Sequence, residues 1–266
     1  MPALRLTRTI QRIVRGVHAR LLDRGLPERI ALQGHQLSSK YHPAFREMAA
    51  FFKQQGYVFT DPEGLQRQQG SRCVMISFDD CFRDWFESLE LLDELSIKVT
   101  FYVNTLPLRD LADRETLSEF RERIGFATRT FEPLSCEELV GLRACGHTIG
   151  SHSHSHFNLA SFTPSKAREE IRTGKMALER IIGERVDHFA YPYGRRRHFT
   201  PALQEICRQY GFKTIASGIP GQLHAPRSGL LHRTMWDFEK PLQYNLQNVR
   251  IDGTLFERIT GRSAVG

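Results

Sequence analysis

The segment Cys73-Val74-Met75-Ile76-Ser77-Phe78-Asp79-Asp80 joins a short apolar run to two adjacent carboxylates. A short apolar run bounded by polar residues is typical of a buried strand. Two carboxylates at its end are costly unless a cation or a solvent-filled cleft receives them, because desolvated like charges repel. A helix cap ahead of Asp84 would account for one aspartate but does not need two. The segment therefore predicts a buried strand that ends in a functional site.

Strands and helices alternate on both sides of this segment. We expect strands at residues 98–103, 188–191, 212–217 and 230–236, and helices at 43–55, 84–95 and 163–182, with further helices after Ser135 and Thr200. Such alternation predicts a parallel sheet with helical crossovers, for which closure into a barrel is one solution. Loops that follow the strands then gather at one face and carry the chemistry. We expect an N-terminal segment 1–30, a barrel domain 31–245 and a C-terminal tail 246–266.

A second polar stretch, Gly146-His147-Thr148-Ile149-Gly150-Ser151-His152-Ser153-His154-Ser155-His156, concentrates histidines. Neutral imidazole is a good ligand for zinc and its first-row neighbours. On a helical turn His152 and His156 share a face and His154 points away, whereas on a strand all three share one face. A polar surface loop is the alternative, but the acidic pair favours a metal site. One aspartate with two histidines would leave coordination positions open for water and substrate.

Composition restricts the class of protein. The chain has 266 residues, of which 40% are hydrophobic and 25% charged, as in ordinary soluble domains. Its net charge of +7 favours anionic partners, but no basic stripe with interleaved aromatic residues indicates nucleic-acid binding. The five cysteines form no CxxC pair, which favours a reducing compartment over a disulfide framework. No apolar run is long enough to predict a transmembrane helix.

The N-terminal segment is basic and amphipathic. Apolar residues recur at helical spacing, and another face carries arginines (Arg5, Arg8, Arg12 and Arg15). The segment lacks the apolar core of a secretory signal. Such a helix can lie on an anionic membrane surface or pack on the domain, and the sequence leaves both alternatives open. We therefore expect a cytoplasmic protein with peripheral membrane contact through this helix as one alternative.

With these residues in place, the chain resembles the polysaccharide deacetylase family, the NodB-homology carbohydrate esterases, from about His35 to Trp236. Three patterns carry the resemblance. Ser77-Phe78-Asp79-Asp80 is similar to the family's T-F-D-D, His152-Ser153-His154-Ser155-His156 to H-[S/T]-x-x-H, and Ala190-Tyr191-Pro192-Tyr193 to R-x-P-Y. The resemblance implies a distorted (β/α) barrel of about seven or fewer β/α units.

The resemblance also implies roles for individual residues. Asp79 would be the general base, and Asp80, His152 and His156 would bind a divalent metal, zinc in the first place, with cobalt, manganese or nickel as alternatives. The backbone N–H of Tyr193 would stabilise the tetrahedral oxyanion.

Two features of the motifs depart from the family or are ambiguous. Ala190 replaces the family's arginine, which normally orients the base, and the arginines 195–197 are candidate substitutes. Leu230-Leu231-His232 is similar to the closing L-x-H motif, so His232 is the first candidate for the general acid. The other candidates are His147, His154 and His224.

These observations predict a metal-dependent hydrolase that removes N-acetyl groups, or O-acetyl groups, from a sugar of a polysaccharide or lipid-linked glycan. The alternative is a glycan-binding module that retains the metal site but does little chemistry, motivated by Ala190 and the uncertain acid. The sequence does not identify the sugar, the metal or the oligomeric state.

Overall fold

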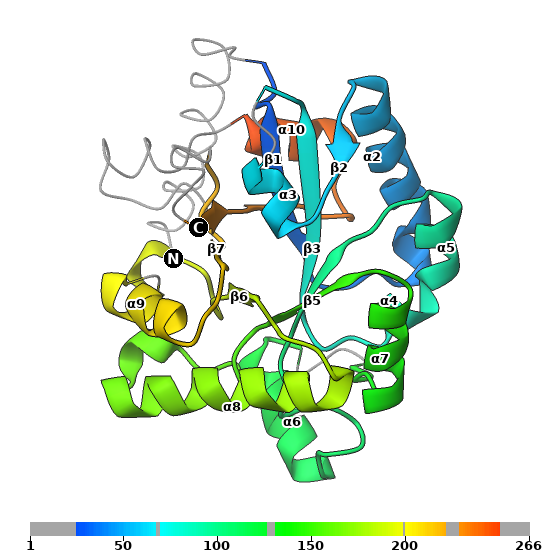
Figure 1. Ribbon diagram of the computed structural model, residues 1–266. Helices are drawn as coiled ribbons and strands as arrows, with labels where there is room; N and C mark the ends of the chain where they lie inside the picture. The colour runs from blue at the N-terminus through cyan, green and yellow to red at the C-terminus, as the bar shows by residue number, and fades with distance from the viewer. Residues whose placement is uncertain (1–24, 68–69, 127–130, 199, 222–228, 251–266) are drawn as a thin grey trace, which may run out of the picture.

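The computed structural model describes residues 25–67, 70–126, 131–198, 200–221 and 229–250 (Figure 1). Its strands are β1 (Arg29–Gly34), β2 (Val58–Phe59), β3 (Cys73–Asp80), β4 (Thr100–Val103), β5 (Thr148–Ser151), β6 (His188–Ala190), β7 (Thr214–Ser217), β8 (Leu230–His232) and β9 (Thr234–Met235). Its α-helices are α2 (His42–Gln54), α3 (Pro62–Arg67), α4 (Asp84–Glu87), α5 (Leu89–Glu94), α6 (Arg114–Arg123), α7 (Cys136–Ala144), α8 (Pro164–Ile182), α9 (Pro201–Gln209) and α10 (Leu242–Val249). Short 3-10 helices lie at η1 (Ser39–Tyr41), η2 (Leu159–Ser161) and η3 (Arg196–His198).

Eight of the described strands form a parallel sheet in the order β8-β7-β6-β5-β4-β3-β1-β9, and β2 pairs in parallel with β3 outside this order. The two ends of this order, β8 and β9, are separated in the chain only by Arg233. Because β8 pairs with β7 and β9 pairs with β1, the bend at Arg233 joins the two edges of the sheet. The predicted (β/α) barrel is therefore confirmed, and helices such as α2, α5, α8 and α9 lie around the outside of the strands (Figure 1).

Alternation along the strands divides the core into two layers. One buried cluster combines strand residues such as Val74 and Ile76 with helix residues such as Phe45 and Leu178, so it lies between the strands and the outer helices. The other cluster consists of strand residues and Leu65 of α3, and it fills the inside of the barrel. Its members are Ala31, Leu65, Cys73, Met75, Tyr102, Ala190, Ala216 and Leu231.

Capping residues, prolines and glycines begin and end several helices where the sequence predicted. Ser135 and Glu138 form the reciprocal capping box at the start of α7. Thr163 caps α8 and Pro164 occupies its first turn, while Gly183 ends it in the left-handed conformation with φ 71°. These local hydrogen bonds depend on neighbouring residues alone, which is why sequence patterns predict them well.

Two expectations about elements were wrong or incomplete. The helix expected at residues 84–95 is interrupted at Ser88, a buried residue that lies between the end of α4 at Glu87 and the start of α5 at Leu89. The Ser88 hydroxyl donates a hydrogen bond to the carbonyl of Leu37, which ties this point of the chain to the segment after β1. Strand β1 itself was not predicted, although Ile30, Ala31 and Leu32 are apolar and buried.

The expected segment boundaries do not coincide with element ends. Strand β1 begins at Arg29, inside the segment 1–30, and α10 crosses residue 246 because Leu246 and Val249 are buried against the core. Residues 1–24 of the predicted N-terminal segment 1–30 and residues 251–266 of the predicted tail lie outside the described residues. Among the described helices, none combines the length and apolar character needed to cross a membrane.

Candidate active site

The two aspartates and the histidine loop lie at the carboxyl ends of two strands that are separated by a single strand. Strand β3 carries Asp79 and Asp80 at its carboxyl end, and the histidine loop begins directly after β5. Strand β4 lies between them, and its residue Val103 pairs with Asp80 on one side and with Ser151 on the other. This register places His152 one residue beyond the level of Asp80. The carboxyl ends of parallel strands meet at one face, so residues 72 positions apart in the chain converge there.

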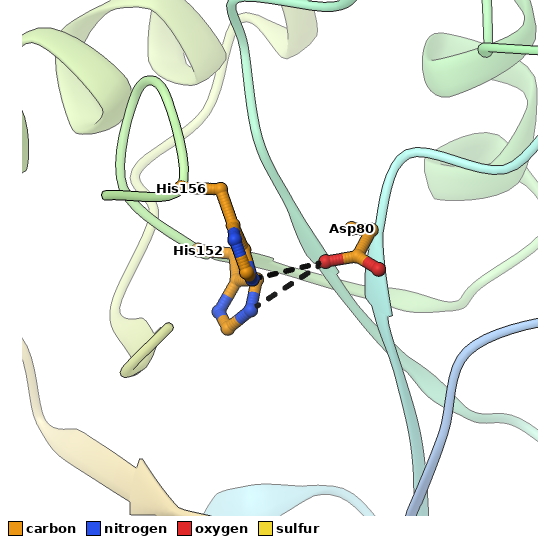
Figure 2. Close-up of side chains that lie close together, drawn as sticks. All are labelled: Asp80, His152 and His156. Atoms are coloured by element: carbon orange, nitrogen blue, oxygen red, sulfur yellow. Dashed lines mark ion pairs between the residues drawn. The ribbon is translucent and has the colours of Figure 1, made fainter. Parts of the chain in front are cut away.

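Asp80, His152 and His156 form a buried cluster (Figure 2). The Oδ1 atom of Asp80 lies 3.4 Å from Nε2 of His156 and 3.8 Å from Nε2 of His152. One ligand atom from each residue lies within 4.8 Å of the others, and among the described residues no other His, Cys, Asp or Glu joins such a group. Two imidazole nitrogens and one carboxylate oxygen are a donor set suited to a divalent metal.

Hydrogen bonding orients His152 as a ligand. Its Nδ1 lies 2.8 Å from the backbone carbonyl of Ala190, and a carbonyl can only accept, so Nδ1 carries the proton. The lone pair is then on Nε2, which faces Asp80. Burial lowers the pKa of His152 to about 4 and holds the pKa of His156 well below its ordinary value. Both rings are therefore neutral at pH 7, the form that binds metals.

The surroundings of the Asp80 carboxylate are suited to a bound cation. Burial and the charge of Asp79 raise the pKa of Asp80 well above its ordinary value. Its Oδ1 is buried and makes no hydrogen bond within the described part of the chain. A buried acceptor left without a donor costs free energy, and a cation between the carboxylate and the imidazoles would remove that cost.

The histidine loop adopts neither the helical nor the strand conformation considered above. Ser153 and His156 have φ values of 68° and 60°, in the left-handed region, so the loop doubles back after His152. The Nδ1 of His154 lies 2.7 Å from the Thr105 hydroxyl, which turns this ring away from the cluster. His152 and His156 therefore converge while the histidine between them has a structural partner.

Helix α8 supports this loop from the outside. The Glu170 carboxylate accepts hydrogen bonds from the backbone N–H of Ser155 at 3.0 Å and from its hydroxyl at 2.6 Å. One helical turn later, a Cβ at Gly174 would lie 2.7 Å from the backbone carbonyl carbon of Ser153 and 2.9 Å from the nitrogen of His154. Only a glycine allows the helix and the loop to approach this closely.

Asp79 has a partner that the sequence analysis missed. Arg233 donates from Nη1 to Oδ1 and from Nη2 to Oδ2 of Asp79, and both residues are buried. Burial alone would raise the pKa of Asp79, but the charge of Arg233 and the hydrogen bonds that it donates act against burial, and the pKa lies below its ordinary value. Arg233, between β8 and β9, thus takes the place of the family's arginine, for which this chain has Ala190. The candidate substitutes Arg195, Arg196 and Arg197 are exposed instead.

His35 also lies at the site and was not among the predicted candidates. Gly34 of β1 pairs with Phe78 of β3, so His35 continues the register beside Asp79 and shares its inward face. The pKa of His35 is lowered by burial and responds to the charges of Asp79 and Arg233. The apolar run that precedes His35 could have revealed it, because it resembles, in shorter form, the run that precedes Asp79.

The other candidate residues lie in different surroundings. The Tyr193 ring lies 5.0 Å from the His156 ring between centroids, so Tyr193 borders the cluster. His232 interacts through Nδ1 with the Ser217 hydroxyl at 2.8 Å, and strand alternation directs it opposite to Leu231 of the barrel interior. His147 precedes β5, at the opposite end of the strand from the cluster, and His224 lies outside the described residues.

A family model described as polysaccharide deacetylase matches residues 66–215, more than half of the chain. The chain belongs to the polysaccharide deacetylase family. This match contains β3 with both aspartates and the histidine loop, the two segments that form the cluster.

Individual relatives are more distant. The chain is 22% identical over 150 residues to YxkH of Bacillus subtilis (strain 168), which is provisionally named a polysaccharide deacetylase; the match covers 56% of this chain and 47% of that protein. The chain therefore spans about half the length of this relative.

Two solved structures share the fold. The deacetylase PplD from Streptococcus pyogenes, in complex with acetate, has a TM-score of 0.65 at 19% identity, covering 85% of this chain and 99% of that chain. IcaB from Ammonifex degensii has a TM-score of 0.66 at 19% identity, covering 83% and 96%. At this level of identity the similarity shows the (β/α) barrel fold alone.

Proposed function

We propose that this member of the family is a metal-dependent hydrolase that removes N-acetyl groups, or O-acetyl groups, from a sugar of a polysaccharide or lipid-linked glycan. One observation carries the proposal: the two adjacent carboxylates have different partners. Asp80 faces His152 and His156, whereas Asp79 is held by Arg233. This separation is what a hydrolytic site needs, because one carboxylate can serve as a metal ligand while the other serves as a base.

Asp80, His152 and His156 would hold the metal. A divalent metal, when bound there, supplies a Lewis acid that lowers the pKa of water and polarises a carbonyl. Zinc suits two imidazoles and one carboxylate, and cobalt, manganese or nickel are alternatives.

Asp79 would act as the general base that takes the proton of the attacking water. Its lowered pKa keeps it ionised at neutral pH, and the two hydrogen bonds from Arg233 fix the orientation of its carboxylate. Its Oδ2 lies 3.9 Å from Nε2 of His152, so the base adjoins the cluster without belonging to it. A positioned general base contributes roughly 10²–10⁴-fold to the rate of a reaction.

The backbone N–H of Tyr193 would stabilise the oxyanion of the tetrahedral intermediate. Tyr193 has φ 63°, and Gly194 after it has φ 57°. A Cβ at Gly194 would lie 2.3 Å from the backbone nitrogen of Gly218, so the turn is pressed against the loop after β7. A turn held in this way keeps a backbone donor in a constant direction, which is the property that oxyanion stabilisation requires.

The leaving amine needs a proton, and His35 in its protonated form is the first candidate to donate it. His35 lies beside Asp79 at the end of β1, whereas strand alternation directs His232 away from the barrel interior. His232, the first candidate from the sequence, becomes the second candidate on these grounds.

The alternative, a glycan-binding module with little activity, was motivated by Ala190 and by the uncertain acid. Arg233 supplies a cation at Asp79, and His35 is a second histidine that could act as the acid. Both reasons for preferring the glycan-binding module are therefore weaker. A cytoplasmic place of action at a membrane surface, with a lipid-linked substrate, remains part of the proposal.

Acetate release tests the proposed function. The purified protein is incubated with N-acetylated oligosaccharides, with zinc or cobalt added and after chelation, and free acetate is measured. Asp80→Asn should lose the metal and the activity, whereas Asp79→Asn should retain the metal and lose roughly 10²–10⁴-fold in kcat. Normal turnover by Asp79→Asn would contradict the assignment of the base. A metal-loaded wild type that binds these glycans without releasing acetate would favour the binding module.

A further inference from the structure

The guanidinium of Arg233 is enclosed inside the barrel, where the residue is only 1% exposed. Its Nε donates to the backbone carbonyl of Ser217 at 3.2 Å, and its Nη1 donates to the Ser77 hydroxyl at 3.0 Å. The two hydrogen bonds to Asp79 complete this set. All of these bonds are directed along the plane of the guanidinium, because its N–H groups lie in that plane. They therefore resist movement within the plane more strongly than tilting out of it.

The aromatic ring of Tyr102 lies against this cation. The Cζ atom of Arg233 is over the ring, 4.9 Å from its centroid. Tyr102 is fully buried and belongs to the cluster of residues that fills the inside of the barrel. A cation over an aromatic face is attracted by the charge distribution of the ring, and the attraction is larger when water is excluded from the pair. The ring thus limits the movement of the guanidinium on this side.

Strand register places this ring at the level of Asp79. Tyr102 of β4 pairs with Asp79 of β3 on one side and with Gly150 of β5 on the other. Paired residues of neighbouring strands point to the same face of a sheet, so all three face the barrel interior. A Cβ at Gly150 would lie 2.5 Å from Cδ1 and 2.7 Å from Cε1 of the Tyr102 ring. The space that the ring occupies therefore exists because residue 150 has no side chain.

We propose that Tyr102 is a positioning residue for the reaction, whose ring holds the Arg233 guanidinium where it donates to both carboxylate oxygens of Asp79. This inference rests on the proposed function, in which Asp79 is the base, and adds to it. Without the ring, the guanidinium can tilt into the vacated space and carry the carboxylate with it. A small displacement of a catalytic group is enough to slow a reaction substantially. Residue 102 therefore requires an aromatic ring, with or without a hydroxyl, and residue 150 requires glycine.

Kinetic and spectroscopic measurements on the same variants test this role. Tyr102→Phe keeps the ring, Tyr102→Leu removes it, and Gly150→Ala displaces it. Phe101→Leu is the matched control, because it removes a neighbouring buried ring of β4 that packs in the outer layer of the core.

Three properties are measured for each variant. Acetate release from an N-acetylated oligosaccharide gives kcat and KM, and titration against a competing chelator gives the dissociation constant for zinc. NMR spectra of the arginine Nε–H groups report on Arg233 directly, and its signal is identified by its absence from the spectrum of Arg233→Lys.

We expect Tyr102→Leu and Gly150→Ala to lower kcat by about threefold to thirtyfold, with KM and zinc affinity close to the wild-type values. Tyr102→Phe should match the wild type in all three constants. The Arg233 signal should persist in Tyr102→Phe and in Phe101→Leu, and it should shift or exchange with solvent in the other two variants.

Wild-type kcat together with an unchanged Arg233 signal in Tyr102→Leu would overturn the role of Tyr102. Gly150→Ala decides in the same way if Tyr102→Leu does not fold. An equal loss of kcat in Phe101→Leu would also overturn it, because the loss would then follow from packing alone. If the wild type releases no acetate, the proposed function fails, and the Arg233 signals still decide whether Tyr102 holds the guanidinium.

Discussion

Arg233 donates hydrogen bonds of 2.6 Å and 2.8 Å to the two carboxylate oxygens of Asp79, although 154 positions separate the residues in the chain. Arg233 is also the single residue between the end of β8 and the start of β9. The connection that joins the two edges of the sheet therefore also places the Arg233 guanidinium against Asp79, the candidate base. Closure of the barrel and orientation of Asp79 depend on the same residue.

Replacing Arg233 should change the pH dependence of the reaction. Arg233 lowers the pKa of Asp79, so its loss raises that pKa, and the base becomes protonated at a higher pH. The acidic limb of the kcat/KM profile of Arg233→Gln should move to higher pH. Arg233→Lys keeps the charge and should move it less.

The matched control is Arg143→Gln, which removes a surface pair with Glu184 and should leave the profile in place. Arg233→Gln should also lose roughly 3–5 kcal/mol of stability, because a buried carboxylate is left without its partner. An Arg233→Gln profile that overlays the wild type would show that Arg233 does not act on the base.

Replacing His35 should affect amides more than activated esters. An amine leaves poorly without a proton, whereas an aryl alcohol leaves as its anion. We expect His35→Gln to lose about 10²–10⁴-fold in kcat on an N-acetylated oligosaccharide and much less on an aryl acetate. His232→Gln is the comparison, and a selective loss in that variant instead would assign the acid to His232.

Gly174→Ala should weaken the metal site while improving the helix locally. Alanine in a helix interior is favoured over glycine by about 1 kcal/mol. The added Cβ would, however, meet the backbone of Ser153 at 2.7 Å and displace the histidine loop. We expect the dissociation constant for zinc, measured against a competing chelator, to rise by about tenfold or more.

Gly141→Ala in α7 is the control for this substitution. Its Cβ would meet the far end of the Phe86 ring at 2.8 Å, and a ring can move more easily than a backbone. Zinc affinity should remain at the wild-type value in this variant. If the zinc affinity of Gly174→Ala is also unchanged, the histidine loop accommodates the added Cβ without moving His152 and His156.

Acid should destabilise the fold partly through His147. This ring is buried, accepts a hydrogen bond from the backbone N–H of Val99 at 3.2 Å, and has a pKa lowered by burial from 6.5 to about 4. Between these two values the unfolded chain binds a proton that the folded protein does not, so stability falls as the pH falls. The contribution is on the order of 3 kcal/mol at pH 4.

Urea unfolding between pH 7 and pH 4 measures this contribution. His147→Gln retains a hydrogen-bond acceptor but does not titrate, so its free energy of unfolding should depend less steeply on pH than that of the wild type. The difference should correspond to about one proton in the steepest range. Parallel curves for the two proteins would show that His147 is protonated without cost.

Local patterns in the chain account for much of what was predictable. The apolar run before Asp79, the capping box at Ser135 and the Pro164–Gly183 signals each depend on residues close in sequence. They were enough to predict alternating strands and helices, and hence a barrel with its polar loops at one face. The two polar stretches that supply Asp80, His152 and His156 were identifiable because their residue types are costly or unusual where they occur.

Only the tertiary structure decided which distant residues complete the site. Arg233 and His35 stand in no recognisable motif, and they reach Asp79 through the pairing of β1 with β3 and through the bend between β8 and β9. The left-handed turns at Ser153 and His156 likewise depend on Glu170 and Gly174 of α8. The sequence alone shows which chemical group each residue carries. Which groups lie next to one another is decided by strand register and packing, and these depend on the whole barrel.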